Sequence, residues 1–262
     1  MPNRPIRIGV QIQPQHAEYA AIRDAAARAE DMGVDIVFNW DHFFPLQGDR
    51  AGKHFECWTM LGAWAEQTSR VEIGALVGCH AYRNPELLAD MARTVDHISG
   101  GRLILGYGAG WFEHDFDEYG YEFGTAGTRI AAMGEGLERI RARFERLNPA
   151  PTRRIPILIG GGGERKTLRQ VARHADVWHG FGDADTIRHK CEVLDGWCER
   201  EGRDPAEIER SCGVSRSRPG QVGDALRAVG VTTFQLSAGG PDYELSGLKP
   251  WLQYRDAVNG AS

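Results

Sequence analysis

Short apolar runs alternate along this chain with longer segments in which apolar residues recur every three or four positions. Runs of β-branched and aliphatic residues between turn residues are typical of buried strands. Such runs occur at Ile6–Ile12, Asp35–Asn39, Val71–Val77, Leu103–Tyr107, Ile155–Ile159, Asp176–His179, Ile208–Val214 and Thr233–Leu236. The helical period predicts helices at Glu18–Met32, Phe55–Thr68, Pro85–Ile98, Thr128–Leu147, Arg165–His174, Asp185–Glu201, Gln221–Val229 and Leu248–Ala257.

The helix at Pro85–Ile98 has the best-defined ends. Asn84 can cap its first amides, and Pro85 suits the first helical position. Gly100 and Gly101 supply a stop after the last apolar position. This segment therefore anchors the alternation of strands and helices that a parallel sheet requires.

Eight strand–helix pairs within 262 residues match a (β/α)8 TIM barrel, an α/β fold that commonly fills about 250 residues as one domain. A doubly wound open sheet is the alternative, because periodicity alone does not separate the two. We expect residues 1–262 to form one barrel domain.

Charge and composition exclude several classes of protein. The 31 Lys and Arg residues stand against 36 Asp and Glu residues, a net charge of −5, so nothing favours nucleic-acid binding. The N-terminus lacks the apolar region of a signal peptide, and no stretch approaches the ~20 apolar residues of a membrane span. We therefore expect a cytoplasmic protein without membrane contact.

Cysteine and histidine spacing predicts no metal site. The five cysteines contain no CxxC pair and read as free, mostly buried thiols, and the nine histidines show neither HxH nor HExxH spacing. The reactive groups should therefore be side chains that act without a bound metal ion. In a barrel these follow the carboxyl ends of the strands.

The end of the second strand brings an acid and an imidazole together. Asp41 and His42 lie among aromatic residues in the segment 39–45. An imidazole there could donate a hydrogen bond to a flat heterocycle or move a proton. The alternative is that the pair merely closes a turn.

Glycines follow the third and fourth strands. Gly78 could admit a ligand ring close to the backbone or form a bulge. Gly108 and Gly110 could form a floor for a ring, with Trp111, Glu113 or His114 reaching into the pocket. Taken alone, each of these glycines could equally belong to an ordinary turn.

The run Gly160–Gly163 lies between a strand and a helix, where backbone amides meet the positive end of the helix dipole. Arg165 and Lys166 add charge for a phosphate. The run is neither a P-loop nor a GxGxxG fingerprint. The alternative is a flexible loop.

As a set, four stretches resemble the luciferase-like flavin and deazaflavin oxidoreductases. They are Tyr82-Arg83-Asn84-Pro85, His97-Ile98-Ser99-Gly100-Gly101-Arg102-Leu103, Gly108-Ala109-Gly110-Trp111-Phe112-Glu113 and Ile157-Leu158-Ile159-Gly160-Gly161-Gly162-Gly163. The resemblance implies a (β/α)8 barrel with a cofactor in its mouth, preferably the deazaflavin coenzyme F420, with FMN as the alternative. It also implies a homodimer.

The resemblance further implies roles for individual residues. His42 would face the reactive edge of the cofactor ring, with Asp41 supporting it or binding polar groups of the ring. His42 or Glu113 would move the proton that accompanies hydride transfer. The remaining cofactor-binding candidates are Leu76, Val77 and Gly78, where relatives carry a non-prolyl cis peptide behind the ring, Gly108, Ala109 and Gly110 along the ring or its side chain, and Gly161, Gly162 and Gly163 at the phosphate.

The leading functional hypothesis is hydride transfer between F420 and a small organic substrate. The alternatives are an FMN-dependent monooxygenase on the same scaffold, a cofactor-binding protein without turnover, and a lyase or isomerase on a phosphate-binding barrel. The last would need a Schiff-base lysine or an acid pair at the strand ends, and no lysine is convincingly placed there.

Overall fold

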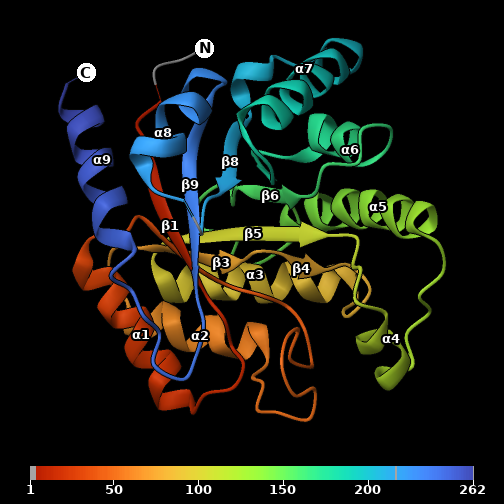
Figure 1. Ribbon diagram of the computed structural model, residues 1–262. Coiled ribbons are helices and arrows are strands. Elements are labelled where there is room, and N and C mark those ends of the chain that lie inside the picture. The colour runs from red at the N-terminus through yellow and green to blue at the C-terminus, as the bar shows by residue number, and fades with distance from the viewer. Residues whose placement is uncertain (1–3, 216, 262) are drawn as a thin grey trace.

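Parallel strands close into a barrel in the computed structural model, which describes residues 4–215 and 217–261 (Figure 1). Residues 1–3, 216 and 262 of the predicted domain lie outside the described residues. The strands are β1 (Arg7–Ile12), β2 (Ile36–Asn39), β3 (Glu72–Ala75), β4 (Gly78–Cys79), β5 (Leu103–Gly108), β6 (Ile157–Gly160), β7 (Val177–Gly180), β8 (Glu209–Gly213) and β9 (Val231–Ala238).

Each strand pairs in parallel with its neighbours in the order β3-β2-β1-β9-β8-β7-β6-β5-β4. The pairing of β3 with β5 closes the ring, and β4 pairs with β5 further along, so β3 and β4 are two parts of one barrel strand. The architecture is therefore a (β/α)8 TIM barrel, as the alternation of strands and helices predicts, and an open sheet is excluded.

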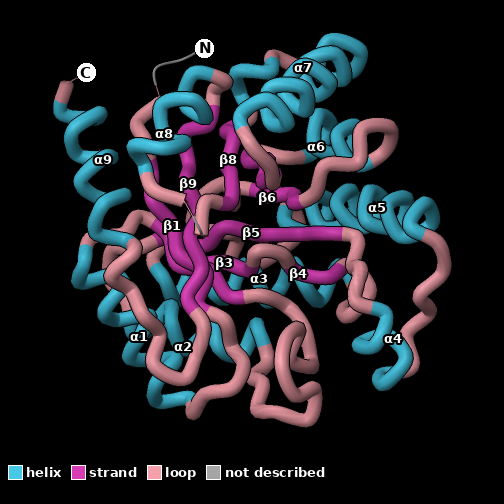
Figure 2. Tube along the Cα trace, in the orientation of Figure 1, coloured by secondary structure: helices cyan, strands magenta, loops and turns pink. Residues whose placement is uncertain are grey.

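Helices surround the barrel, and both described ends of the chain lie near α8 and α9 (Figures 1 and 2). The helices are α1 (Tyr19–Met32), α2 (Cys57–Gln67), α3 (Pro85–Ser99), α4 (Glu113–Tyr119), α5 (Ala126–Phe144), α6 (Thr167–His174), α7 (Ala184–Glu201), α8 (Pro219–Ala228) and α9 (Leu248–Gly260), with a 3-10 turn at Pro205–Glu207. The eight predicted helices are confirmed to within a few residues, whereas α4, β4 and the 3-10 turn were not predicted.

The predicted ends of α3 are confirmed in detail. The Asn84 side chain accepts hydrogen bonds from the amides of Glu86 and Leu87, at 2.9 and 3.1 Å. Gly100 has φ 65°, the left-handed conformation that favours glycine at a helix end. The cap fixes where the chain leaves the barrel mouth, and the stop fixes where it turns into β5 at the opposite end of the barrel.

The core forms between the barrel and its helices, and its largest fully buried side chains include Trp64, Trp178 and Trp251. All five cysteines are buried free thiols, as predicted. Within the described ranges, no helix has the length and apolarity needed to cross a membrane, and no group of His, Cys, Asp and Glu residues is placed to hold a metal ion.

Candidate active site

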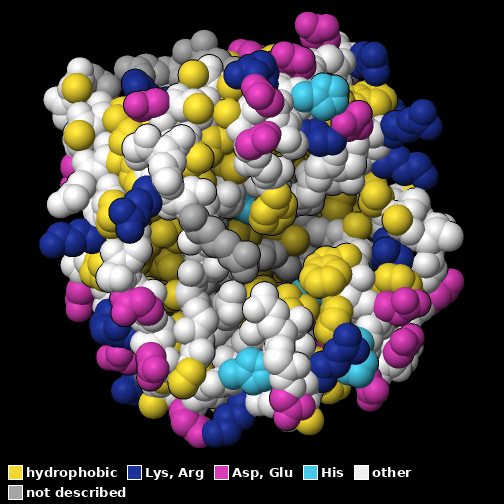
Figure 3. Space-filling view, viewed as in Figure 1, with side chains coloured by type: hydrophobic (Ala, Val, Ile, Leu, Met, Phe, Trp, Pro, Cys, Tyr) yellow, Lys and Arg dark blue, Asp and Glu magenta, His cyan; other side chains and the backbone are white. Residues whose placement is uncertain are grey.

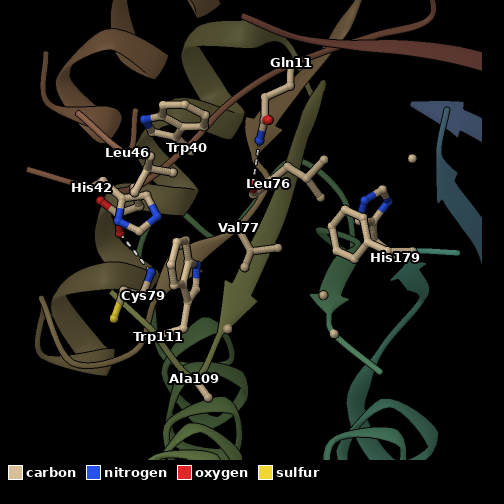
Figure 4. Close-up of a pocket in the computed structure, with 18 of the residues that line it drawn as sticks. Gln11, Trp40, His42, Leu46, Leu76, Val77, Cys79, Ala109, Trp111 and His179 are labelled. Atoms are coloured by element: carbon tan, nitrogen blue, oxygen red, sulfur yellow. Dashed lines mark hydrogen bonds between the residues drawn. The ribbon is translucent and has the colours of Figure 1, made fainter. Parts of the chain in front are cut away.

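A cavity of about 580 Å³ opens at the carboxyl ends of the barrel strands. Figure 3 shows hydrophobic and histidine side chains at the hollowed centre of this face, and Figure 4 shows the lining residues. Every barrel strand contributes to it. The lining includes Gln11, Trp40, Asp41, His42, Leu46, Leu76, Val77, Gly78, Gly108, Ala109, Gly110, Trp111, Arg129, Gly160, Gly161, His179, Phe181, Ser215 and Gln235.

The floor of this cavity is a bulge in the third barrel strand. Gly74 pairs with Ile104 and Gly78 pairs with Tyr107, so the third strand has one residue more than β5 between these pairs. The peptide bond between Leu76 and Val77, within the bulge, is cis. The expectation of a non-prolyl cis peptide at this strand end is confirmed.

Glycine makes this floor possible because the two strands approach each other closely. A Cβ atom on Gly106 would lie 1.7 Å from the carbonyl oxygen of Ala75. A Cβ on Gly78 would lie 2.8 Å from the oxygen of Gly106. The space beside Gly78 is thus taken by the neighbouring strand, and Gln11 holds the bulge by donating to the Leu76 carbonyl at 2.7 Å.

Asp41 ties the bulge to the next helix. Its carboxylate accepts from the Cys79 amide at 2.9 Å and from both terminal nitrogens of Arg83, at 2.7 and 3.1 Å. Arg83 also donates to Glu56 at 2.5 Å, and although burial lowers the pKa of Arg83, these carboxylates raise it above its ordinary value. Asp41 lines the cavity, but both its oxygens already have partners.

His42 is held by an acid that the sequence analysis did not identify. Its Nδ1 lies 2.6 Å from Oδ2 of Asp115, near the start of α4, and Asp115 is 0% exposed. Tyr82 donates to the same oxygen at 2.9 Å, and the amides of Phe43 and Phe44 donate to Oδ1. The support of His42 is thus Asp115 and not Asp41.

The surroundings of Asp115 keep it ionised. Burial raises the pKa of Asp115, but the hydrogen bonds from His42, Tyr82 and the Phe43 amide outweigh burial and lower the pKa below its ordinary value. An ionised carboxylate only accepts, so Nδ1 of His42 donates and Nε2 is the nitrogen left for the cavity.

Aromatic rings pack against the helix that carries this acid. Phe43 stacks on Tyr119 with ring centroids 3.9 Å apart, and Tyr82 contacts both Phe43 and Phe116. Because Tyr119 and Phe116 belong to α4, this packing fixes the helix that carries Asp115 against the segment that carries His42. The geometry of the pair therefore depends on α4.

On another side of the cavity, the glycine run precedes α6. Gly160, Gly161 and Thr167 line the cavity, whereas Gly162 and Gly163 are exposed at its rim. The Gly161 amide donates to the His179 carbonyl. In the ranges 4–215 and 217–261 no acceptor is found for the amides of Gly162 and Gly163, so these remain available to an anion beside the helix start.

His179 lies on the side of the cavity away from His42 (Figure 4). Its Nδ1 lies 2.9 Å from the Ser211 hydroxyl, and burial lowers the pKa of His179 to about 4. The ring is therefore neutral near pH 7. Neither spacing nor a motif in the sequence marks this residue, because its place depends on the closure of the barrel.

Of the predicted residues, the structure brings Asp41, His42, Leu76–Gly78, Gly108–Gly110 and Gly161 around one cavity. Glu113 is exposed and does not line it. Of Trp111, Glu113 and His114, only Trp111 reaches the cavity, because α4 begins at Glu113 and carries that side chain outward. The acid beside His42 is two residues further on, at Asp115.

Comparisons with known proteins agree with this geometry. A family model described as luciferase-like monooxygenase matches residues 4–217. The chain is 28% identical over 177 residues to an F420-dependent glucose-6-phosphate dehydrogenase of Amycolatopsis mediterranei, covering 60% of this chain and 52% of that protein. The chain spans about half the length of the curated relatives it matches.

Two solved structures are similar in fold. One is an F420-dependent secondary alcohol dehydrogenase in complex with an F420-acetone adduct, with TM-score 0.81, 16% identity, and coverage of 89% of this chain and 93% of that one. The other is the oxygenating constituent of 3,6-diketocamphane monooxygenase from Pseudomonas putida in complex with FMN, with TM-score 0.71, 15% identity, and coverage of 98% and 97%. At such identities the likeness is one of fold.

Proposed function

The chain belongs to the luciferase-like monooxygenase family, and from this premise we propose that it is an oxidoreductase that transfers hydride between coenzyme F420 and a small organic substrate. The observation that carries the proposal is the His42–Asp115 pair beside a bulged, backbone-built floor in the barrel mouth. Such a floor offers a flat surface to a ring, and the imidazole can move a proton next to it. Relatives named for F420 support the choice of coenzyme.

The cavity and its rim offer contacts for both the ring and the phosphate of such a coenzyme. Leu76, Val77 and Gly108 would lie against the ring, and the free amides of Gly162 and Gly163 would bind the phosphate beside α6. F420 supplies hydride transfer at a ring carbon, whereas FMN has nitrogen at that position. The chain itself orients the ring, excludes water and, at Nε2 of His42, holds or accepts a proton.

The second candidate is an FMN-dependent monooxygenase, because an FMN-bound monooxygenase has the same fold. A cofactor-binding protein without turnover is a third. We also propose a single domain over residues 1–262, which the eight strand–helix pairs favour, a homodimer, which the resemblance implies, and a cytoplasmic location.

Titration of the apo-protein with F420 and, separately, with FMN tests the proposal, followed by the fluorescence of each cofactor. We expect F420 to bind at micromolar concentration and FMN at least about tenfold more weakly, a difference of about 1.4 kcal/mol. Tight FMN binding with weak F420 binding would assign the chain to the monooxygenases. Binding of neither would remove the catalytic proposal.

A matched pair of variants locates the phosphate. Gly162→Asp places a carboxylate beside the phosphate, and since a Cβ there would lie 3.6 Å from Cε of Lys190, it can also neutralise that lysine. We expect weaker F420 binding. Gly196→Asp adds the same charge on α7, where a Cβ meets nothing within 4 Å, and should leave F420 affinity unchanged.

A further inference from the structure

We infer that the part of the cavity next to His42 takes an uncharged substrate with a flat ring, such as an aryl ketone, and not a phosphorylated or carboxylated compound. The inference rests on the proposed function, whose coenzyme would occupy the floor and the rim at α6. It follows from an exposed aromatic side chain at the cavity and from the small number of charged groups that line it.

Trp111 is the main observation. It lines the cavity although its side chain is 64% exposed, unlike the core tryptophans Trp64 and Trp178, which are 0% exposed. Its ring meets the His42 imidazole edge to face, with centroids 5.7 Å apart (Figure 4). An indole left open beside the proposed proton carrier offers its surface to a ring next to the reacting atoms.

A second aromatic residue is exposed at the cavity. Phe181 lines it with 68% of its surface exposed and packs edge to face on His179, with centroids 4.7 Å apart. The other large exposed hydrophobic residues named in the described chain, such as Leu87 and Tyr119, do not line the cavity. Exposed aromatic surface at a cavity is typical of a binding site.

Few charged groups line the cavity. Among the described lining residues the one carboxylate is Asp41, which Arg83 and the Cys79 amide bind. The one lysine or arginine is Arg129, whose guanidinium donates to the carbonyls of Gly110 and Phe123 and stacks on the Phe123 ring at 3.8 Å. A charged substrate would therefore lose its hydration and gain at most this one cation, which carbonyl oxygens and the Phe123 ring already hold.

The remaining surface of this part is apolar. Leu46, Ile130 and Met133 line the cavity with carbon atoms, and the indole nitrogen of Trp40 donates away to His54 at 2.9 Å. Arg50 lies over the ring of Phe112, and neither residue lines the cavity. The surface beside His42 thus resembles that of pockets for uncharged ligands.

Cationic residues gather instead around the glycine run. Arg165 and Lys166 flank the start of α6, and Lys190 pairs with Glu164 at 2.6 Å. The phosphate of the coenzyme would thus bind at the glycine run, and the part of the cavity beside Trp111 would be left for the substrate. The ketone carbon would then lie near the coenzyme ring, with its oxygen towards Nε2 of His42.

Isothermal titration calorimetry on protein loaded with oxidised F420 tests the inference, because the oxidised coenzyme has no hydride to give and binding is measured without turnover. The probes are acetophenone and 4-acetylbenzoate, which share a ring and a ketone and differ by one carboxylate, together with glucose 6-phosphate. We expect acetophenone to bind at least about tenfold more tightly than either anion.

Three variants assign the effect to Trp111. Trp111→Ala should weaken acetophenone binding about tenfold, Trp111→Phe should restore most of it, and Leu87→Ala, on the outer surface of α3, should change nothing. Circular dichroism of each variant checks folding.

The outcomes distinguish a failure of the proposed function from a failure of the proposed substrate class. Failure of the wild-type protein to bind F420, measured before any ketone is added, removes the proposed function. Normal F420 binding with tighter binding of 4-acetylbenzoate or glucose 6-phosphate overturns the substrate class alone. Loss of F420 affinity in Trp111→Ala, with acetophenone affinity unchanged, would assign the indole to the coenzyme and also overturn the inference.

Discussion

His42 and Asp115 lie 73 positions apart in the sequence and form one functional pair in the structure. The buried carboxylate has four donors, from His42, Tyr82 and two backbone amides, which satisfy its charge without any arginine or lysine. It therefore determines which nitrogen of His42 carries the proton. Asp115 is thus a positioning residue for the imidazole.

Replacing Asp115 tests this role. Asp115→Asn keeps the size but offers a single acceptor to four donors, so it should lower the free energy of unfolding by about 1–3 kcal/mol, measured by urea denaturation. Turnover with a ketone should fall far more than F420 affinity, and the pH profile of kcat should change with it. His42→Ala should give the same split between turnover and coenzyme affinity.

Tyr82→Phe is the matched control because it removes one donor to Asp115 and keeps the ring in the aromatic cluster. It should cost about 1 kcal/mol of stability and leave most of the turnover. If Asp115→Asn behaves like Tyr82→Phe in turnover, Asp115 does not position His42.

The sequence identified His42 but not its partner. The resemblance implied Asp41 as the support, whereas the contact depends on a loop and a short helix, α4. Periodicity does not reveal this helix because it has only seven residues. The resemblance implied Glu113, three residues after Gly110, as the second catalytic candidate. A helix that starts at Glu113 turns that side chain outward and Asp115 inward, a distinction that requires the start of the helix to be known.

At the level of elements, the third strand depends on its neighbour. β3, the bulge and β4 run so close to β5 that Gly106 has no room for a side chain. The apolar pattern predicted a strand over Val71–Val77, and a bulge was one of the interpretations of Gly78. The pattern alone could not decide for it, because a bulge is set by pairing with a strand distant in the sequence.

Gly106→Ala should therefore disrupt the barrel. Its Cβ would lie 1.7 Å from the Ala75 oxygen, and we expect a loss of at least about 2–3 kcal/mol of stability or no soluble folded protein. Gly196→Ala, within α7 and with open space around the Cβ, should instead stabilise by about 0.5–1 kcal/mol. Urea denaturation compares the two, and equal midpoints would show that β3 and β5 tolerate more separation than the structure has.

In helix α3, the apolar pattern indicates which residues are buried only in part. The residues that recur at three and four positions include Leu88 and Val95, which are buried, and also Leu87 and Ile98, which are exposed. The caps were predicted correctly because they depend on local hydrogen bonds. The buried face follows from the apolar pattern only in part, because it depends on neighbouring helices.

For the whole molecule, acid should weaken the fold. Burial is the first cause that lowers the pKa of His54, His80, His174 and His179, each to about 4 from an ordinary value of 6.5. Between these pH values the unfolded chain binds more protons than the folded chain, so stability falls as pH falls. Asp115 and Glu56, whose pKa values are lowered despite the opposing effect of burial, add to the loss in the same direction at lower pH.

Urea midpoints at pH 7 and pH 5 measure this effect. For His179 alone we expect a loss of about 1–2 kcal/mol between these conditions, and His179→Gln should reduce the dependence on pH. His189→Gln, at an exposed position, is the control and should not alter it. A midpoint that stays constant from pH 7 to pH 5 would contradict neutral buried imidazoles.

The barrel itself could be predicted from the sequence because eight β-branched runs recur with helical segments between them. The location of the site could be predicted, since the candidates line the same cavity except for Glu113, His114, Gly162, Gly163, Arg165 and Lys166. The hydrogen bonds within the site could not be predicted, because His179, Gln11 and Asp115 meet the other residues only after the ring of strands has closed.

The floor beneath this cavity has a consequence for how new specificity can arise. Its shape comes from backbone held by Gly106, Gln11 and the Asp41–Arg83 pair, while the aromatic residues at the opening come from separate loops after β5 and β7. Substitutions at Trp111 or Phe181 can therefore be selected without disturbing the floor of the cavity. Laboratory libraries restricted to these two positions should yield altered substrate ranges at little cost in folding, whereas libraries that include Gly106 should yield mostly unfolded chains.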